Sequence, residues 1–208
     1  MFTGIVTAIG IVQRIRVHAH GMQMTIAAAD YGKDIHLGNS ISVNGCCLTV
    51  TQRTSDNFDV DVGLQTLTST CMADMTVGTR VNLEKALTLQ QLLGGHLVTG
   101  HVDGVANIVA LEEEGLSQLL TLEVPEAFAR YIALKGSIAL NGVSLTVQSV
   151  ERNRFTIMLI PFTRNHTVLT NLHVGMRLNF EVDILARYLE RLVHYTPNAI
   201  RKEESVKE

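Results

Sequence analysis

Val43-Asn44-Gly45-Cys46-Cys47-Leu48-Thr49-Val50 is the stretch that decides the fold, because it occurs twice in the chain. It returns 97 residues later as Leu140-Asn141-Gly142-Val143-Ser144-Leu145-Thr146-Val147. The same offset, without a gap, superimposes further matches: 77–84 on 174–181, Thr66 on Thr163, and Thr70 on Thr167. Two long copies indicate a duplicated domain rather than a solenoid of short repeats.

Within this stretch the two copies differ at a polar position, where Cys47 in the first copy corresponds to Ser144 in the second. Two copies of one fold predict two pockets of one shape. This substitution predicts that the two pockets are chemically different, which is the strongest functional indication within the repeat itself.

Composition narrows the class of protein. The chain has 208 residues and a net charge of −3 at pH 7, which gives no electrostatic basis for nucleic-acid binding. No apolar run approaches the roughly 18 residues of a membrane span, and the first residues lack a basic start and an apolar core. Three cysteines, two of them adjacent, do not form a disulfide framework. The sequence predicts a soluble, cytoplasmic protein.

Most of the secondary-structure signal is typical of strands. Each copy has short segments rich in Val, Ile and Thr, and turn residues such as Asp56-Asn57 and Arg152-Asn153 separate them. Strands are expected at 1–13, 22–28, 40–52, 58–62 and 80–83, and again at 119–124, 137–150, 155–160 and 177–182. This pattern predicts an all-β fold of two tandem small barrels, with six strands in each copy.

Two segments have helical character. Ala86 to Leu93 ends at Gly94-Gly95, a plausible helix stop. Asp183 to His194 carries two apolar rows of i, i+4 spacing, which together form a wide stripe that a barrel or a partner subunit must bury. Residues 196–208 are polar and are expected to form a loose tail. The predicted divisions are 1–97, 98–182 and 183–208.

The histidines are the first candidates for metal ligands in this sequence. His18-Ala19-His20 would place two imidazoles on one strand face, but Gly21 follows, and exposed histidines at a hairpin end are the simpler interpretation. His96 and His101 lie five residues apart, so in an extended strand they face opposite ways and make a poor joint metal site. No metal site is predicted.

Cys46 and Cys47 should point to opposite faces of a strand, so only one can line a given pocket. A core cysteine is the ordinary interpretation of either. Cys47 and Thr49 share a face, as do Ser144 and Thr146. Such hydroxyls are often satisfied barrel residues, yet their recurrence in both copies equally suggests a small polar ligand site.

At five motifs in register the sequence resembles riboflavin synthases. They are Met1–Val6, Asn44–Val50, Gly94–Gly104, Asn141–Val147 and Glu181–Tyr188, and the likeness runs in order from residue 1 to about residue 194. Each motif alone is weak, whereas five in order are specific. The resemblance implies Greek-key barrels and a C-terminal helix, 183–208 with its tail, that assembles a homotrimer.

The resemblance implies a dismutation of two molecules of 6,7-dimethyl-8-ribityllumazine. One molecule gives a four-carbon unit to the other, and the products are riboflavin and 5-amino-6-(ribitylamino)pyrimidinedione. The resemblance implies no metal and no redox cofactor, active sites between subunits, and lumazine synthase as a candidate partner protein.

The family's functional positions fall on named residues of this chain. The resemblance implies catalytic roles for Cys47, His101, Ser144, Thr146 and Asp183. It implies substrate contacts for Phe2, Gly4, Ile5, Val6, Ser40, Cys47, Thr49, Val62, Gly63, Gln65, Thr66, His96, Gly100, His101, Val102, Lys135, Ser144, Thr146, Ile160, Pro161, Phe162 and Thr163.

Some roles stay open at this level. Cys47 can serve as nucleophile or as proton donor, and His101 and Asp183 are both candidate proton carriers. Gln65 stands where family members often have glutamate, and Phe162 is its counterpart in the second copy. The alternative function is a non-catalytic lumazine- or flavin-binding antenna protein, but such relatives lose catalytic side chains that this chain retains.

Overall fold

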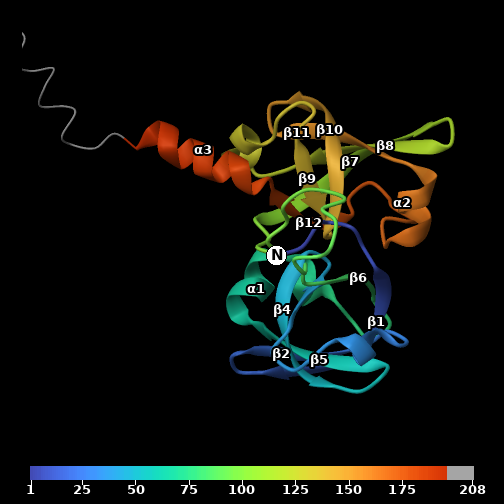
Figure 1. Ribbon diagram of the computed structural model, residues 1–208. Helices are drawn as coiled ribbons and strands as arrows, with labels where there is room; N and C mark the ends of the chain where they lie inside the picture. The colour runs from blue at the N-terminus through green and yellow to red at the C-terminus, as the bar shows by residue number, and fades with distance from the viewer. Residues whose placement is uncertain (196–208) are drawn as a thin grey trace, which may run out of the picture.

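The computed structural model describes residues 1–195 and consists of two β-barrels stacked one on the other, with a helix leaving the upper barrel (Figure 1). The first barrel contains β1 (Ala8–His18), β2 (Gly21–Ala27), β3 (Ser40–Val43), β4 (Cys46–Arg53), β5 (Asn57–Gly63) and β6 (Arg80–Lys85). The second contains β7 (Gly104–Glu114), β8 (Ser117–Glu123), β9 (Ser137–Leu140), β10 (Val143–Glu151), β11 (Arg154–Leu159) and β12 (Arg177–Val182).

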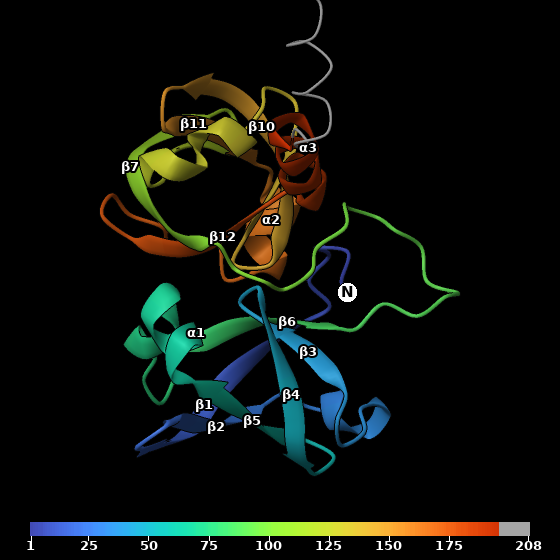
Figure 2. The same cartoon turned by 90° about the vertical axis from the view of Figure 1, so that its left-hand side faces the viewer.

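Both barrels close in the same antiparallel order. The first runs β1-β2-β5-β4-β3-β6, and the second runs β7-β8-β11-β10-β9-β12 (Figure 2). Each encloses its own apolar core, because inward side chains alternate with outward ones along every strand. The predicted all-β fold of two tandem six-stranded barrels is therefore confirmed.

The stretch that opens the repeat is a hairpin, so the expectation of one continuous strand over 40–52 is wrong. Asn44 and Gly45 have φ values of 44° and 84°, and they join β3 to β4 in a two-residue turn. Positive φ at both turn residues is the geometry that Asn-Gly favours. Asn141 and Gly142 repeat it between β9 and β10, which likewise divides the strand expected over 137–150.

Short helices that the strand pattern did not predict close the barrel ends. They are α1 (Leu64–Ser69), α2 (Pro161–His166) and the 3₁₀ turns η1 (Tyr31–Asp34), η2 (Cys71–Asp74) and η3 (Glu126–Tyr131). α1 and α2 follow the last residues of β5 and β11, so they occupy equivalent places in the two barrels.

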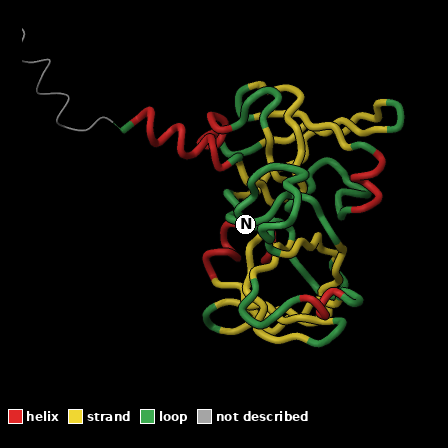
Figure 3. The backbone as a smooth tube through the Cα atoms, in the orientation of Figure 1, coloured by secondary structure: helices red, strands yellow, loops and turns green. Residues whose placement is uncertain are grey.

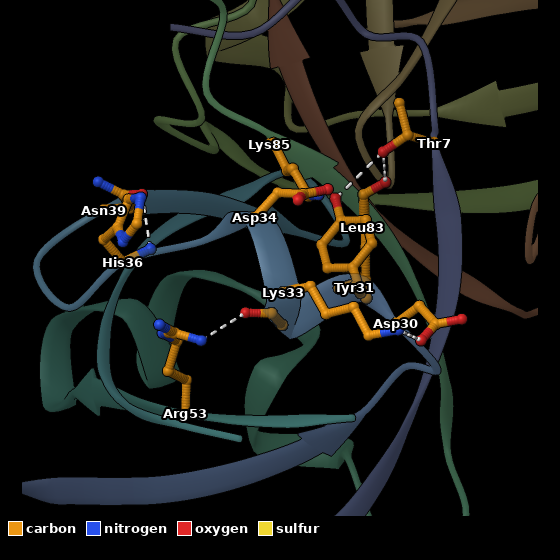
Figure 4. A network of polar contacts seen from close by, with 11 residues as sticks. Thr7, Asp30, Tyr31, Lys33, Asp34, His36, Asn39, Arg53, Leu83 and Lys85 are labelled. Atoms are coloured by element: carbon orange, nitrogen blue, oxygen red, sulfur yellow. Dashed lines mark hydrogen bonds and ion pairs between the residues drawn. The ribbon is translucent and has the colours of Figure 1, made fainter. Parts of the chain in front are cut away.

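A polar network attaches η1 to the first barrel (Figure 4). The hydroxyls of Tyr31 and Thr7 are 3.1 Å apart, and the ammonium of Lys85 lies 4.6 Å from the centre of the Tyr31 ring. Burial raises the pKa of Tyr31 to about 12. Arg53 donates from Nη1 to the Gly32 carbonyl at 3.1 Å, which fixes the other side of the turn.

Residues 86–93 do not form the expected helix. The segment is irregular, and one backbone bond, from Gln91 N to the Thr88 carbonyl, marks a single turn (Figure 3). Leu89 and Leu92 are 103% and 88% exposed. An eight-residue helix needs tertiary packing to be stable, and these side chains do not have it.

Four asparagines join the barrels across a pseudo-twofold axis. Asn82 donates from Nδ2 to the Asn141 carbonyl, and Asn179 donates from Nδ2 to the Asn44 carbonyl, both at 2.9 Å. The side-chain oxygens of Asn44 and Asn141 accept from the backbone N–H of Asn82 and Asn179. All four side chains are buried, so the interface is specific as well as apolar.

The C-terminal helix, α3 (Ile184–His194), confirms the second helical prediction. Asp183 caps it and accepts from Leu185 N at 3.0 Å. Its polar side is hydrogen-bonded to η3 of the second barrel: Glu190 accepts from Arg130 at 2.9 Å and from the Tyr131 hydroxyl. Its apolar face is outside, with these residues 59–75% exposed: Leu185, Tyr188, Leu189, Leu192 and Val193. The tail expected over 196–208 lies outside the described residues.

Two remaining expectations concern the surface. His18 and His20 are exposed where the β1–β2 hairpin turns, as predicted. None of the helices in residues 1–195 is both long and apolar enough to cross a membrane.

Candidate functional site

Each barrel is closed by a segment that leads into the other barrel. The N-terminal arm (residues 3–6) precedes β1, yet the Gly4 carbonyl accepts the backbone N–H of Ser144 on β10 at 2.8 Å. The inter-barrel arm (residues 99–102) precedes β7, yet the Gly100 carbonyl accepts the N–H of Cys47 on β4 at 2.8 Å. Val6 packs on the second core and Val102 on the first. The two arms are therefore exchanged.

Both arms depend on a glycine at the point of contact. Gly4 and Gly100 have φ values of 76° and 81°. A Cβ on Gly4 would lie 2.6 Å from the Ser144 Cβ, and a Cβ on Gly100 would lie 2.5 Å from the Cys47 Cβ. Only glycine combines this backbone conformation with so close an approach.

The arms meet at an apolar cluster between the barrels. Phe2 and Val98 form a two-residue bridge, with N–H to carbonyl distances of 2.7 and 3.1 Å. Both are fully buried together with Ala139, and the half-buried Cys47 packs against them.

The first site, which we call the Cys47 site, is a hollow of about 260 Å³ at one end of the first barrel. It is lined by Cys46, Cys47, Gln65, Thr66, Ser69, Thr70, Gly100, His101 and Val102. β4 supplies the cysteines, α1 the amide and hydroxyls, and the inter-barrel arm the exposed His101. A larger hollow, of about 440 Å³, lies at the other end of β4 and contains none of the predicted site residues.

The adjacent cysteines point to opposite faces, as predicted. Cys46 is 2% exposed in the first core, and burial raises its pKa to about 12. Burial also raises the pKa of Cys71 to about 11. A thiol with so high a pKa carries little thiolate at neutral pH. Of the two cysteines that line the hollow, Cys46 is buried and Cys47 is half-buried, so Cys47 is the accessible one.

The second site, which we call the Ser144 site, gathers residues from β10, the segment between the barrels and the cap of α3. His96 Nδ1 lies 2.7 Å from Ser144 Oγ. His96 is buried, and its Nε2 has no hydrogen-bond partner within residues 1–195. Burial lowers the pKa of His96, and the charges of Asp183 and Glu181 oppose that shift. His96 is thus a neutral imidazole with one free nitrogen beside a hydroxyl.

The other predicted contact residues lie at several places. Thr49 and Thr146 are exposed on β4 and β10, opposite Ser40 and Ser137. Lys135 is exposed, with φ of 63° where Gly38 stands in the first copy. Ile5, Ile160, Pro161 and Phe162 are exposed, Thr163 is half-buried, Gly63 precedes α1, and Val62 is a core residue.

Two buried glutamates belong to this arrangement and were not predicted. Glu84 accepts from Thr3 N, Thr3 Oγ1 and Gly4 N at 2.6, 2.7 and 3.0 Å. Glu181 accepts from Thr99 N, Thr99 Oγ1 and Gly100 N at 2.7, 2.7 and 2.9 Å. The repeat could have indicated them, because the same offset relates both glutamates. Nothing in the repeat indicates the hydrogen bond between His96 and Ser144.

Comparison with known proteins agrees with this geometry. The sequence matches the family model of the lumazine binding domain twice, at residues 3–86 and 99–183. It is 40% identical to the riboflavin synthase of Bacillus subtilis (strain 168), over 93% of this chain and 90% of that protein. The chain belongs to the riboflavin synthase family.

Other members of the riboflavin synthase family are equally similar. Those of Brucella abortus (strain 2308) and Mycobacterium bovis are 41% and 42% identical, over 94% and 93% of this chain and 99% and 98% of theirs. As a riboflavin synthase family member the chain is an enzyme.

Solved structures share the double barrel of this family. LumP complexed with riboflavin is 28% identical, with a TM-score of 0.81 over 88% of this chain and 99% of that chain. LumP complexed with 6,7-dimethyl-8-(1'-D-ribityl) lumazine is 27% identical, with a TM-score of 0.79 over the same shares.

Proposed function

We propose that the enzyme converts two molecules of 6,7-dimethyl-8-ribityllumazine into riboflavin and 5-amino-6-(ribitylamino)pyrimidinedione. A four-carbon unit passes from one lumazine to the other, so the reaction needs no external donor. The observation that carries the proposal is the pair of equivalent but chemically different sites, one with Cys47 and His101 and one with Ser144 and His96. Two unlike sites suit two identical molecules that must take different roles.

The two lumazines of one reaction are proposed to bind to sites on two neighbouring chains. α1, which lines the Cys47 site, lies on the left of the lower barrel, whereas α2, its counterpart in the second copy, lies on the right of the upper barrel (Figure 1). A hollow of about 260 Å³ is also small for a complete ligand site. A Cys47 site facing the Ser144 site of a neighbour would enclose both substrates.

Positioning supplies much of the rate in this proposal. Holding two heterocycles in contact replaces a bimolecular encounter by an effectively unimolecular step. The remaining chemical task is to remove a proton from the 7-methyl group of one lumazine, and the ring delocalises the resulting anion. Modest general-base assistance is then sufficient.

In the Ser144 site, Ser144 and His96 are proposed to move that proton. A neutral His96 can accept the Ser144 proton across their 2.7 Å contact while Ser144 Oγ takes the proton of the substrate. Burial lowers the pKa of His96 and the charge of Asp183 opposes that shift, so Asp183 stabilises the imidazolium that forms. Asp183 itself caps α3, which favours an electrostatic role over proton transfer. Thr146 and Lys135 are proposed to bind the substrate.

In the Cys47 site, Cys47 and His101 are proposed to act on the second lumazine. Cys47 is accessible on β4, and the arm residue His101 lines the same hollow. Gln65 and Thr66 on α1 offer amide and hydroxyl groups to the ring or the ribityl chain. A cytoplasmic location, which belongs to the same proposal, would keep Cys47 a free thiol.

The deciding experiment is incubation of the purified enzyme with the lumazine alone. Riboflavin formed at half the molar amount of lumazine consumed is the expected result, because each riboflavin needs two substrates. Tight binding without turnover would instead support the antenna function and would contradict the proposal.

Replacing either reactive side chain of the Cys47 site should impair turnover and spare stability. For Cys47→Ala and His101→Ala we expect kcat to fall by about 10²-fold or more, as for loss of an acid–base group. The melting temperature should change little, because Cys47 is only half-buried and His101 is exposed. Cys71→Ala is the control, since Cys71 is absent from the lining of this hollow. Parallel losses of stability and activity would mark the two residues as structural.

We propose that α3 assembles the chain into a homotrimer, because its apolar face is exposed and a neighbouring chain could bury it. Association with lumazine synthase stays a prediction. We expect Leu189→Glu with Leu192→Glu to give monomers in sedimentation velocity, because charges then replace two of the exposed apolar side chains. Leu116→Glu is the matched control, since Leu116 is 84% exposed on the β7–β8 hairpin. An unchanged oligomer in the double variant would contradict the role of α3.

A further inference from the structure

Glu84 and Glu181 occupy equivalent places on β6 and β12, and both are almost completely buried, at 2% and 4% exposure. A buried carboxylate is costly unless hydrogen bonds satisfy it. Burial raises the pKa of Glu84, and the bonds from Thr3 and Gly4 oppose that shift. The hydrogen bonds of each carboxylate must therefore offset that cost, and neither glutamate has a chemical role in the proposed reaction.

Within residues 1–195, every hydrogen bond of the two glutamate side chains goes to an exchanged arm. Each carboxylate accepts two backbone N–H groups and one threonine hydroxyl, at 2.6–3.0 Å. Bonds to an ionised acceptor are roughly twice as strong as neutral ones. Each arm is therefore fixed along its N–H edge by a carboxylate.

The opposite edge of each arm contacts a site strand. The Gly100 carbonyl accepts from Cys47 N, and the Gly4 carbonyl accepts from Ser144 N. His101, which follows Gly100, is exposed and lines the Cys47 site, and Ile5, which follows Gly4, is also exposed. The carboxylate and the site strand thus hold the same glycine from two sides.

We propose that Glu181 is a positioning residue for the Cys47 site and that Glu84 is a positioning residue for the Ser144 site. Each glutamate belongs to one barrel and orders the arm that completes the site of the other barrel. The inference rests on the proposed function for what the two sites do. The positioning of the arms does not depend on the reaction, so the inference can be tested in the absence of substrate.

If each glutamate instead acted within its own barrel, Glu84 would affect the Cys47 site and Glu181 would affect the Ser144 site. Glu84 pairs with Ser42, and Ser42 pairs with Cys47, so Glu84 is two strands from Cys47 in its own barrel. Glu181 is two strands from Ser144 through Ala139 in the same way. Action through the sheet of one barrel and action through the exchanged arm therefore predict opposite effects of the two glutamates on the two sites.

The test compares Glu181→Gln with Glu84→Gln, two isosteric changes at equivalent positions. One readout is the rate at which iodoacetamide alkylates Cys47, followed by mass spectrometry of the peptide that contains it. The other is the imidazole NMR signal of His96, assigned with a His96→Gln variant. Both readouts use the full-length enzyme without substrate.

For Glu181→Gln we expect Cys47 to be alkylated about tenfold faster, because a weakened arm opens more often. Because the charge of Glu181 also acts on the pKa of His96, the His96 signal is compared in Thr99→Val, which keeps that charge, and there it should stay in place. For Glu84→Gln we expect the His96 signal to shift, while alkylation of Cys47 stays within about twofold of the wild type. The reverse pattern, or no change in either variant, would overturn the proposal.

Milder variants keep the test valid if a glutamine variant does not fold. Thr99→Val removes one donor to Glu181 and should accelerate Cys47 alkylation over the wild-type rate, and Thr99→Ser should restore that rate. If lumazine turnover is absent in the wild type but the crossed pattern appears, the proposed function fails and the positioning roles stand.

Discussion

Gly100→Ala should lower kcat/KM for lumazine turnover by about 100-fold or more, because a misplacement of about 1 Å at a reacting site can cost that much. The new methyl group would lie 2.5 Å from the Cys47 Cβ and 2.9 Å from the Cys47 N and from the Phe2 ring. The inter-barrel arm must then withdraw from β4, which moves His101 away from Cys47.

A control separates this contact from the cost of the backbone conformation. Gly38 has φ of 82°, close to the 81° of Gly100, and no heavy atom of residues 1–195 lies within 4 Å of its added Cβ. Gly38→Ala should therefore cost about 1–2 kcal/mol of stability and leave turnover near the wild type. Steady-state kinetics and thermal unfolding of both variants check the prediction. Similar turnover in the two variants would show that arm contact is dispensable.

Two inactive variants should restore activity when they are refolded together. One carries Cys47→Ala and His101→Ala, and the other carries His96→Ala and Ser144→Ala. Asp183 is left intact because it caps α3, the helix to which we assign assembly in the proposal. If productive sites lie between neighbouring chains, about one quarter of the interfaces in randomly mixed trimers combine two intact sites.

Activity near that fraction of the wild-type value is the expected outcome, and native mass spectrometry should confirm mixed trimers. Each variant refolded alone should stay at background. Mixed trimers without activity would mean that a single chain must supply both sites, since no chain in the mixture has both.

The fold could be predicted from the sequence because the repeat and the strand pattern are local signals. The Asn44-Gly45 turn was missed because apolar residues continue on both sides of it. The helix expected over 86–93 was wrong because its leucines imitate helical spacing, although the structure buries neither Leu89 nor Leu92. Both errors come from judging a segment without its tertiary partners.

The candidate site was less accessible to such reasoning. The residues themselves were found through the resemblance, but the repeat did not indicate which of them lie together. Ser144 and His96 are 48 residues apart, and Glu181 and Thr99 are 82 residues apart. Contacts at such separations follow from the exchange of the arms, and no periodicity along the chain encodes that exchange.

The exchanged arms also suggest how two unlike sites could arise. Two separate copies of one barrel that traded arms would form an isologous dimer, in which both sites are identical by symmetry. Any substitution would then appear in both sites at once. Covalent linkage of the copies removes that constraint, because position 47 and position 144 become separate codons. Tandem duplication thus allows one ancestral pocket to evolve into a donor and an acceptor while the interface keeps its twofold geometry.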